Sequence, residues 1–280
     1  MPLEPDEYIL IAGLPRSGST LLQAILNQSD STFTMPEMHF FEQAKKITDS
    51  LQMSRIEVLE LLENLNNKWN ISTGSLAERI QSYPVNSTID LCDLYFQLID
   101  QHHPLNGEFR IGVEKTPGNL FALDELLNRQ SNFKVILTSR NPLDFANSLI
   151  KQYWSPDSIL KISRLWNQSM RKINELKNRH PTRVMVLDYW EMISQPEQAF
   201  GSAYRFTGLD WKKEYLSDIN TKTDEFVIPL ETEWKAENIN QSKVNKSVKK
   251  CSLSLKQRLL LHRECFMTAF SVGYIRRYKF

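Results

Sequence analysis

The chain has 280 residues, 41% of them hydrophobic, and a net charge of only +1. This charge balance argues against a large nucleic-acid surface, and the chain shows neither an 18-residue apolar span nor a secretory pattern after Met1. Three cysteines without metal-ligand spacing indicate reduced thiols, so we expect no metal site. We expect one domain over residues 1–280, in the cytoplasm and away from membranes; the sequence does not indicate an oligomeric state.

The first motif combines a strand, a glycine-bounded loop and a helix. An apolar run over 8–12 predicts a buried strand, and apolar residues within 21–26 predict the inner side of a helix. Backbone N–H groups at such a helix start form an anion site. Residues 13–20 read G-x-x-x-x-G-S-T, which resembles a P-loop in which Ser19 replaces the usual lysine. Arg16 supplies a cation from inside the loop.

Pro15–Leu22 resembles the 5′-phosphosulfate loop of sulfotransferases that use PAPS (3′-phosphoadenosine 5′-phosphosulfate). The similarity extends to bacterial, polyketide-associated and tyrosylprotein-type members of that family. It implies a P-loop-like α/β fold, PAPS as donor and PAP as product. The alternative is a plain turn in some other α/β protein. The resemblance assigns donor binding to Arg16, Ser17, Gly18, Ser19 and Thr20, with Arg16 also acting in catalysis.

The next motif is Met35–Phe41, which follows a strand-like piece over 31–34. Its Pro-Glu-x-His pattern resembles the form seen in some bacterial and polyketide-associated members, where an acidic residue acts as catalytic base. Glu37 or His39 could take the proton of the acceptor, and histidine starts nearer the favoured pKa. Alternatively, Glu37 caps the following helix and His39 packs against a neighbouring phenylalanine.

The segment Ile111–Pro117 predicts a strand that ends in Lys115, followed by a helix from Pro117 to Leu127. The resemblance places a lysine near the transferred group. Lys115 could stabilise charge on the leaving phosphate or on the sulfuryl oxygens. The alternative is a simple ion pair between Glu114 and Lys115 at the strand end.

A second apolar strand, Phe133–Ser139, is followed by Arg140 and by a helix that begins near Pro142. Parallel strands end at one edge of a sheet, so Arg140 should lie beside the first loop. The family resemblance assigns the 3′-phosphate to Arg140 and Ser148, and a bidentate arginine suits a phosphate. Alternatively, Arg140 is a surface residue paired with Asp144.

The resemblance weakens beyond these motifs. Tyr189, after a strand over 183–188, looks like the family tyrosine that approaches the nucleotide. Lys235 is the candidate for a basic loop that closes over the 3′-phosphate, although lysine runs of this kind usually form a solvated surface.

The strands near 8–13, 31–34, 110–114, 133–139 and 183–188 alternate with helical patterns. This order predicts a central parallel sheet with helices on both faces. The clearest helix, within 156–179, has an apolar stripe that includes Trp166 and Met170, which we interpret as core residues. A helical insertion over about 42–108 is expected to cover the acceptor pocket.

Together these features predict an enzyme that moves a sulfuryl group from PAPS to a hydroxyl or amine without a metal. A small molecule, first of all a secondary metabolite, is the preferred acceptor. Carbohydrate, lipid and peptide tyrosine are alternatives. Two other classes stay open: a P-loop nucleotide kinase or ATPase, and a non-catalytic nucleotide-binding protein that kept the fold.

Overall fold

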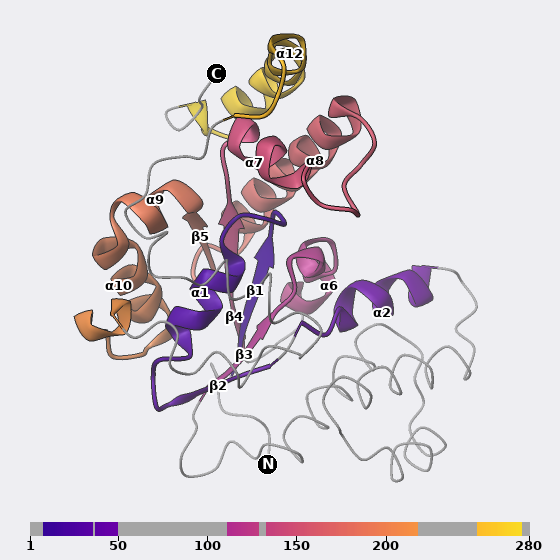
Figure 1. The fold of residues 1–280 in the computed structure, drawn as a ribbon. Coiled ribbons are helices and arrows are strands. Elements are labelled where there is room, and N and C mark those ends of the chain that lie inside the picture. Colours follow the sequence, from indigo (N-terminus) through magenta and orange to yellow (C-terminus); the bar gives the residue numbers. More distant parts are fainter. Residues whose placement is uncertain (1–7, 36, 50–110, 129–132, 218–250, 276–280) are drawn as a thin grey trace.

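The computed structural model describes residues 8–35, 37–49, 111–128, 133–217 and 251–275. Within them, five strands form one parallel sheet in the order β2-β3-β1-β4-β5 (Figure 1). The predicted parallel sheet is therefore confirmed. The strands are β1 (Tyr8–Gly13), β2 (Thr32–Thr34), β3 (Ile111–Lys115), β4 (Phe133–Ser139) and β5 (Val184–Asp188).

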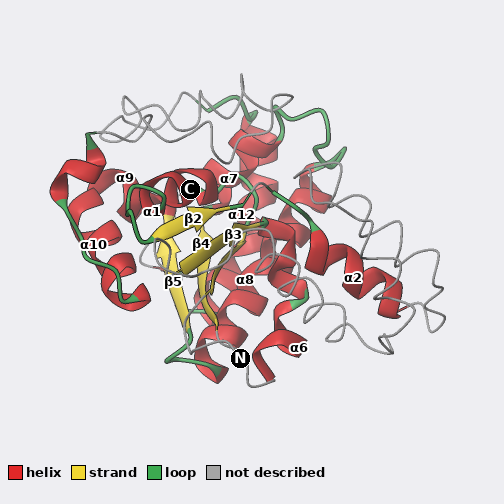
Figure 2. Ribbon diagram, turned by 90° about the horizontal axis from the view of Figure 1, so that it is seen from below, coloured by secondary structure: helices red, strands yellow, loops and turns green. Residues whose placement is uncertain are grey.

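Helices cover both faces of this sheet (Figures 1 and 2). The bounds are α1 (Ser19–Leu26), α2 (Phe40–Asp49), η1 (Pro117–Phe121), α6 (Leu123–Asn128), α7 (Pro142–Leu149), α8 (Ile159–Arg179), α9 (Tyr189–Ser194), α10 (Pro196–Thr207), η2 (Lys213–Leu216) and α12 (Leu255–Ser271). Helices α1, α9 and α10 pack on one face. Elements η1, α6, α7 and α8 pack on the other, and α12 lies outside α7 and α8.

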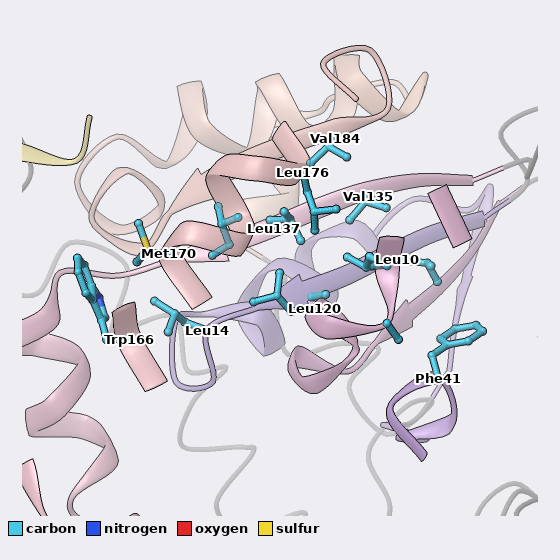
Figure 3. Packing of buried hydrophobic residues seen from close by; sticks show 14 of the residues in the cluster. Leu10, Leu14, Phe41, Leu120, Val135, Leu137, Trp166, Met170, Leu176 and Val184 are labelled. Atoms are coloured by element: carbon cyan, nitrogen blue, oxygen red, sulfur yellow. The ribbon is translucent and has the colours of Figure 1, made fainter. Parts of the chain in front are cut away.

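The central strand β1 is buried on both sides, which explains its continuous apolar sequence. Its side chains alternate between two cores: Leu10 belongs to the α8 side and Ile11 to the α1 side. On the α8 side, Trp166 and Met170 belong to the same buried cluster as Leu10, and Figure 3 shows Trp166 at one end of this cluster, toward Leu14. The interpretation of Trp166 and Met170 as core residues is confirmed.

The prediction of one continuous helix from Pro117 to Leu127 is wrong. The chain instead forms the 3₁₀ element η1, then Ala122, then α6. The Ala122 N–H bonds to the Asn119 carbonyl three residues back at 2.9 Å, which is the tighter winding of a 3₁₀ turn. The buried Asn119 side chain explains this turn, because its hydrogen bonds to Glu114 and Glu42 tie the backbone to the sheet edge.

Two further predictions concern the rest of the chain. No helix in the described parts of the chain is long and apolar enough to cross a membrane. The predicted insertion over 42–108 begins within α2, but from residue 50 onward it lies outside the described residues, as does Lys235. The cover over an acceptor pocket therefore stays a prediction.

Replacement of Trp166 tests the packing of α8 on the sheet. Its fully buried ring donates from Nε1 to the Arg140 carbonyl at 2.9 Å. We expect Trp166→Ala to lower the free energy of unfolding by about 3–5 kcal/mol, since a large cavity opens and a carbonyl loses its donor. Urea unfolding followed by circular dichroism measures the change. The matched control is Leu160→Ala on the exposed side of α8, expected to change stability by no more than about 0.5 kcal/mol. Equal losses in both variants would contradict this account.

Candidate functional site

The candidate site lies at the edge of the sheet where β3, β1 and β4 end. Because these strands are parallel neighbours, the loop after β1 lies between the end of β3 and the end of β4. Lys115 ends β3 and Arg140 directly follows β4. The two predicted parts of the site are therefore brought to one edge, on either side of the predicted anion loop.

The loop after β1 is held by close contact with β4. Gly13 has φ 125°, and a Cβ atom there would lie 2.4 Å from the Thr138 carbonyl oxygen, so only glycine fits. The Leu14 N–H donates to that same oxygen at 3.0 Å. The buried Ser17 hydroxyl bonds to the Leu14 carbonyl and lies 2.6 Å from Thr138 Oγ1. Ser17 therefore stabilises the loop with its side chain.

Left-handed backbone turns the loop into the start of α1. Arg16 has φ 62° and Gly18 has φ 87°. The N-cap residue of α1 is Gly18, which has no side chain to cap the helix, and the first residues of α1 are Ser19 and Thr20. Backbone N–H groups at the start of a helix, after a loop whose residues alternate between right-handed and left-handed conformations, form a concave site for anions.

Arg16, Arg140, Ser148 and Tyr189 form an arginine cluster beside this loop. Arg140 donates from Nη1 to the Arg16 carbonyl at 2.6 Å, and its Cζ lies 4.0 Å from the centre of the Tyr189 ring. The Arg16 Nε donates to Ser148 Oγ at 3.4 Å. Residues that the sequence assigned to two phosphate sites therefore meet in space.

The electrostatics of the arginine cluster favour an anion. Burial, followed by the nearby Arg140 charge, lowers the pKa of Arg16, and burial lowers the pKa of Arg140. Among the residues that the structure describes, the buried Arg140 Nε–H has no hydrogen-bond partner. A buried donor without a partner is costly, and two like charges raise that cost, so a bound phosphate would relieve both.

Packing around the arginine cluster leaves little room for change. A Cβ on Gly18 would lie 2.8 Å from Tyr189 and 2.9 Å from Met192, so α9 presses against the loop. Asp188 caps α9 through a 2.9 Å bond from the Trp190 N–H. This cap fixes the start of the helix that carries Tyr189.

Glu37, His39 and Lys115 form a second group, the glutamate–lysine cluster. The buried Lys115 ammonium pairs with Glu37 Oε2. His39 Nε2 lies 3.5 Å from Glu37 Oε1, and His39 Nδ1 lies 3.4 Å from Glu42 Oε2. Lys115 therefore pairs with Glu37, 78 residues away, and not with adjacent Glu114 as the alternative supposed. Both proposed bases therefore belong to one group of contacting side chains with Lys115.

Glu114 is a buried carboxylate that the sequence reasoning did not nominate. Thr116 Oγ1 donates to its Oε1 at 2.6 Å, and Asn119 Nδ2 donates to its Oε2 at 3.0 Å. Burial raises the pKa of Glu114 to about 7. The sequence did contain a signal for this buried site: a carboxylate inside a predicted strand, followed by Thr116 and Asn119 two and five residues later. Within the described residues, no group of three His, Cys, Asp or Glu could hold a metal ion.

The comparison with known families accounts for this arrangement. A sequence model described as the sulfotransferase family matches residues 8–213, which is more than half of the chain. The chain belongs to the sulfotransferase family. The matched range contains the arginine cluster and the glutamate–lysine cluster.

Solved structures share the fold. The sulfotransferase domain of the Synechococcus PCC 7002 olefin synthase matches with a TM-score of 0.60, 21% identity, and 93% of this chain and 94% of that chain covered. The sulfotransferase domain of the curacin biosynthetic pathway matches at 0.61, with 18% identity and 94% and 98% covered. Mouse sulfotransferase SULT7A1, solved with PAP, matches at 0.57, with 13% identity and 99% and 90% covered.

A protein of Aquifex aeolicus (strain VF5), described as uncharacterized, is 24% identical over 222 residues. The match covers 76% of this chain but only 27% of the Aquifex protein, so the chain spans about a quarter of that relative's length.

The buried Glu114 carboxyl predicts a pH dependence of stability. Its pKa of about 7 in the folded protein lies above the ordinary value of 4.5, so the folded state binds more protons between these pH values. The stability of wild type minus that of Glu114→Gln should therefore fall as pH rises through this window, by at most about 3 kcal/mol, and level off above it. Urea unfolding of both proteins from pH 4 to pH 8 measures the difference. A flat difference would show that Glu114 has an ordinary pKa.

Proposed function

We propose that this protein transfers a sulfuryl group from PAPS to a hydroxyl or amine of a small molecule. The observation that carries the proposal is the meeting of Arg16, Arg140 and Ser148 beside the uncapped start of α1. PAPS carries phosphate groups on both the 3′ and the 5′ oxygen of one ribose, so its site needs two adjacent anion-binding positions. Family membership and the PAP in the mouse structure support the same donor.

The arginine cluster and the loop would divide the nucleotide between them. Arg16 and the backbone N–H groups from Ser17 to Thr20 would hold the 5′-phosphosulfate, as anions are held at helix starts. Arg140 and Ser148 would hold the 3′-phosphate, and the Arg140 Nε–H, which has no partner in the described part of the chain, is a donor for it. Tyr189, stacked on Arg140, fixes the plane of the guanidinium.

The glutamate–lysine cluster would carry the transfer. Glu37 or His39 takes the proton of the acceptor as its oxygen or nitrogen attacks sulfur. A new bond to sulfur forms while the bond between sulfur and the 5′-phosphate oxygen breaks, and its electron pair stays with that phosphate. Lys115 and Arg16 stabilise the charge on the departing PAP.

The geometry leaves the choice between the two bases open. A neutral imidazole has one N–H, so His39 can donate to only one of the carboxylates of Glu37 and Glu42. Glu37 has one oxygen on Lys115 and the other toward His39. Either side chain can therefore receive a proton and share it with the other.

A secondary metabolite is the acceptor that we propose first. Two structures with the same fold come from an olefin synthase and from the curacin biosynthetic pathway. Carbohydrates, lipids and peptide tyrosine are the other acceptors to test. A cytoplasmic location, a single domain and a role for Lys235 stay predictions.

Calorimetric titration with 3′,5′-bisphosphoadenosine tests the donor site. We expect wild type to bind this nucleotide and Arg140→Ala to bind it about 100-fold more weakly, because charge-assisted hydrogen bonds to phosphate are lost. Arg140→Lys is the matched control, because it keeps the charge but not the bidentate geometry. Its affinity for the nucleotide should lie between those of wild type and Arg140→Ala. Preference for ATP with Mg²⁺, or no binding of either nucleotide by wild type, would favour the kinase or the non-catalytic alternative.

Replacement of the two candidate bases tests the catalytic step. We expect one of Glu37→Gln and His39→Gln to lower kcat by about 100-fold or more while bisphosphate binding is kept. PAP release from PAPS is measured with 4-nitrophenol, 2-naphthol and 1-butanol as acceptors. Since Glu37 pairs with buried Lys115, the unfolding midpoint of each variant is checked first. Equal and mild losses in both variants would mean that neither residue is the base.

A further inference from the structure

His39 has a backbone conformation that needs support. Its φ of 59° lies in the left-handed region, which is unfavourable for residues other than glycine. The Gln43 N–H donates to the His39 carbonyl at 3.1 Å, so this conformation directly precedes the first hydrogen bonds of α2. Contacts from outside the segment must therefore hold His39 in place.

Those contacts lead to Glu114 by two routes. The His39 N–H donates to Thr116 Oγ1 at 3.3 Å, and Thr116 Oγ1 donates to Glu114 Oε1 at 2.6 Å. The Glu42 N–H donates to Asn119 Oδ1 at 3.1 Å, and Asn119 Nδ2 donates to Glu114 Oε2 at 3.0 Å. One fully buried carboxylate thus fixes the backbone on both sides of the start of α2.

The direction of these bonds follows from the carboxylate. Above its pKa of about 7, Glu114 is ionised and only accepts, so Thr116 turns its O–H toward Glu114, which leaves its lone pairs for the His39 N–H. Asn119 must turn its NH₂ toward Glu114, which presents its Oδ1 to the Glu42 N–H. A glutamine at 114 offers one acceptor in place of two, so one of the two routes would lose its bond.

We propose that Glu114 is a positioning residue that holds His39, and with it the Glu37–His39 pair, in the geometry needed to accept a proton. This proposal rests on the proposed function for its catalytic consequence, but the placement of His39 can be tested without it. The titratable groups that act on the Glu114 carboxyl electrostatically are Lys115 on its own strand and Glu37 and His39 from the segment before α2.

The position of His39 can be followed by NMR of its ring. We expect the His39 Cε1–H signal, assigned by its loss in His39→Gln, to shift in Glu114→Gln and in Thr116→Val. Thr116→Val has nearly the same shape but lacks the hydroxyl. Thr116→Ser is the matched control, since it keeps the hydroxyl and should leave the signal closer to wild type than Thr116→Val does. An unmoved His39 signal in folded Glu114→Gln would overturn the proposal.

Turnover of PAPS with 4-nitrophenol supplies the second readout. We expect Glu114→Gln and Thr116→Val each to lower kcat by about 100-fold, as small misplacements of catalytic groups do. KM for PAPS and the affinity for 3′,5′-bisphosphoadenosine should change by no more than about twofold, because ground-state binding uses other residues. The double variant should lose clearly less than the product of the two single losses, since the Thr116 route runs to Glu114 and is shared by both substitutions.

The outcomes separate the two proposals. Losses that multiply in the double variant, or a loss confined to KM, would overturn the positioning role while PAPS turnover by wild type stands. Failure of wild type to bind the bisphosphate and to turn over PAPS would overturn the proposed function. The ring signal of His39 in the same variants would then still decide whether Glu114 positions it.

Discussion

The parallel pairing of β1 with β4 is the constraint on which the site depends. Gly13 pairs with Thr138 in this register, and the Leu14 N–H bonds to the Thr138 carbonyl. This contact sets where the anion loop leaves the sheet, and Arg140 follows two residues after Thr138. A shift of one residue in the pairing would point the strand side chains to the opposite faces and separate Arg140 from the loop.

The site itself consists of two groups with different electrostatics. The arginine cluster concentrates positive charge and buried N–H donors, which suits it to hold a polyanion. The glutamate–lysine cluster balances its charges internally through the pair of Lys115 and Glu37. Because the loop after β1 lies between them, a donor bound at the loop would have its leaving group near the arginines and its transferred group near the bases.

The fold was predictable because its signals are local. Strands β1, β4 and β5 are short, largely apolar runs, and α8 repeats apolar residues at helical spacing. The prediction of a helix after Pro117 was wrong because a contact distant in sequence sets the backbone there. The Asn119 side chain donates to Glu114 and accepts from the Glu42 N–H. Helix propensity alone does not predict such a contact.

The sequence by itself nominated the candidate site residues, since the anion loop, Arg140 with Ser148, the Glu37–His39 motif and Lys115 are each visible as a local pattern at a strand or helix end. Only the tertiary structure decided their partners. Lys115 pairs with Glu37, Arg16 contacts Ser148, and the buried Glu114 supports His39 through Thr116. The physical reason is that charge pairing and desolvation depend on distance in space, which the sheet order sets and which separation along the chain does not reveal.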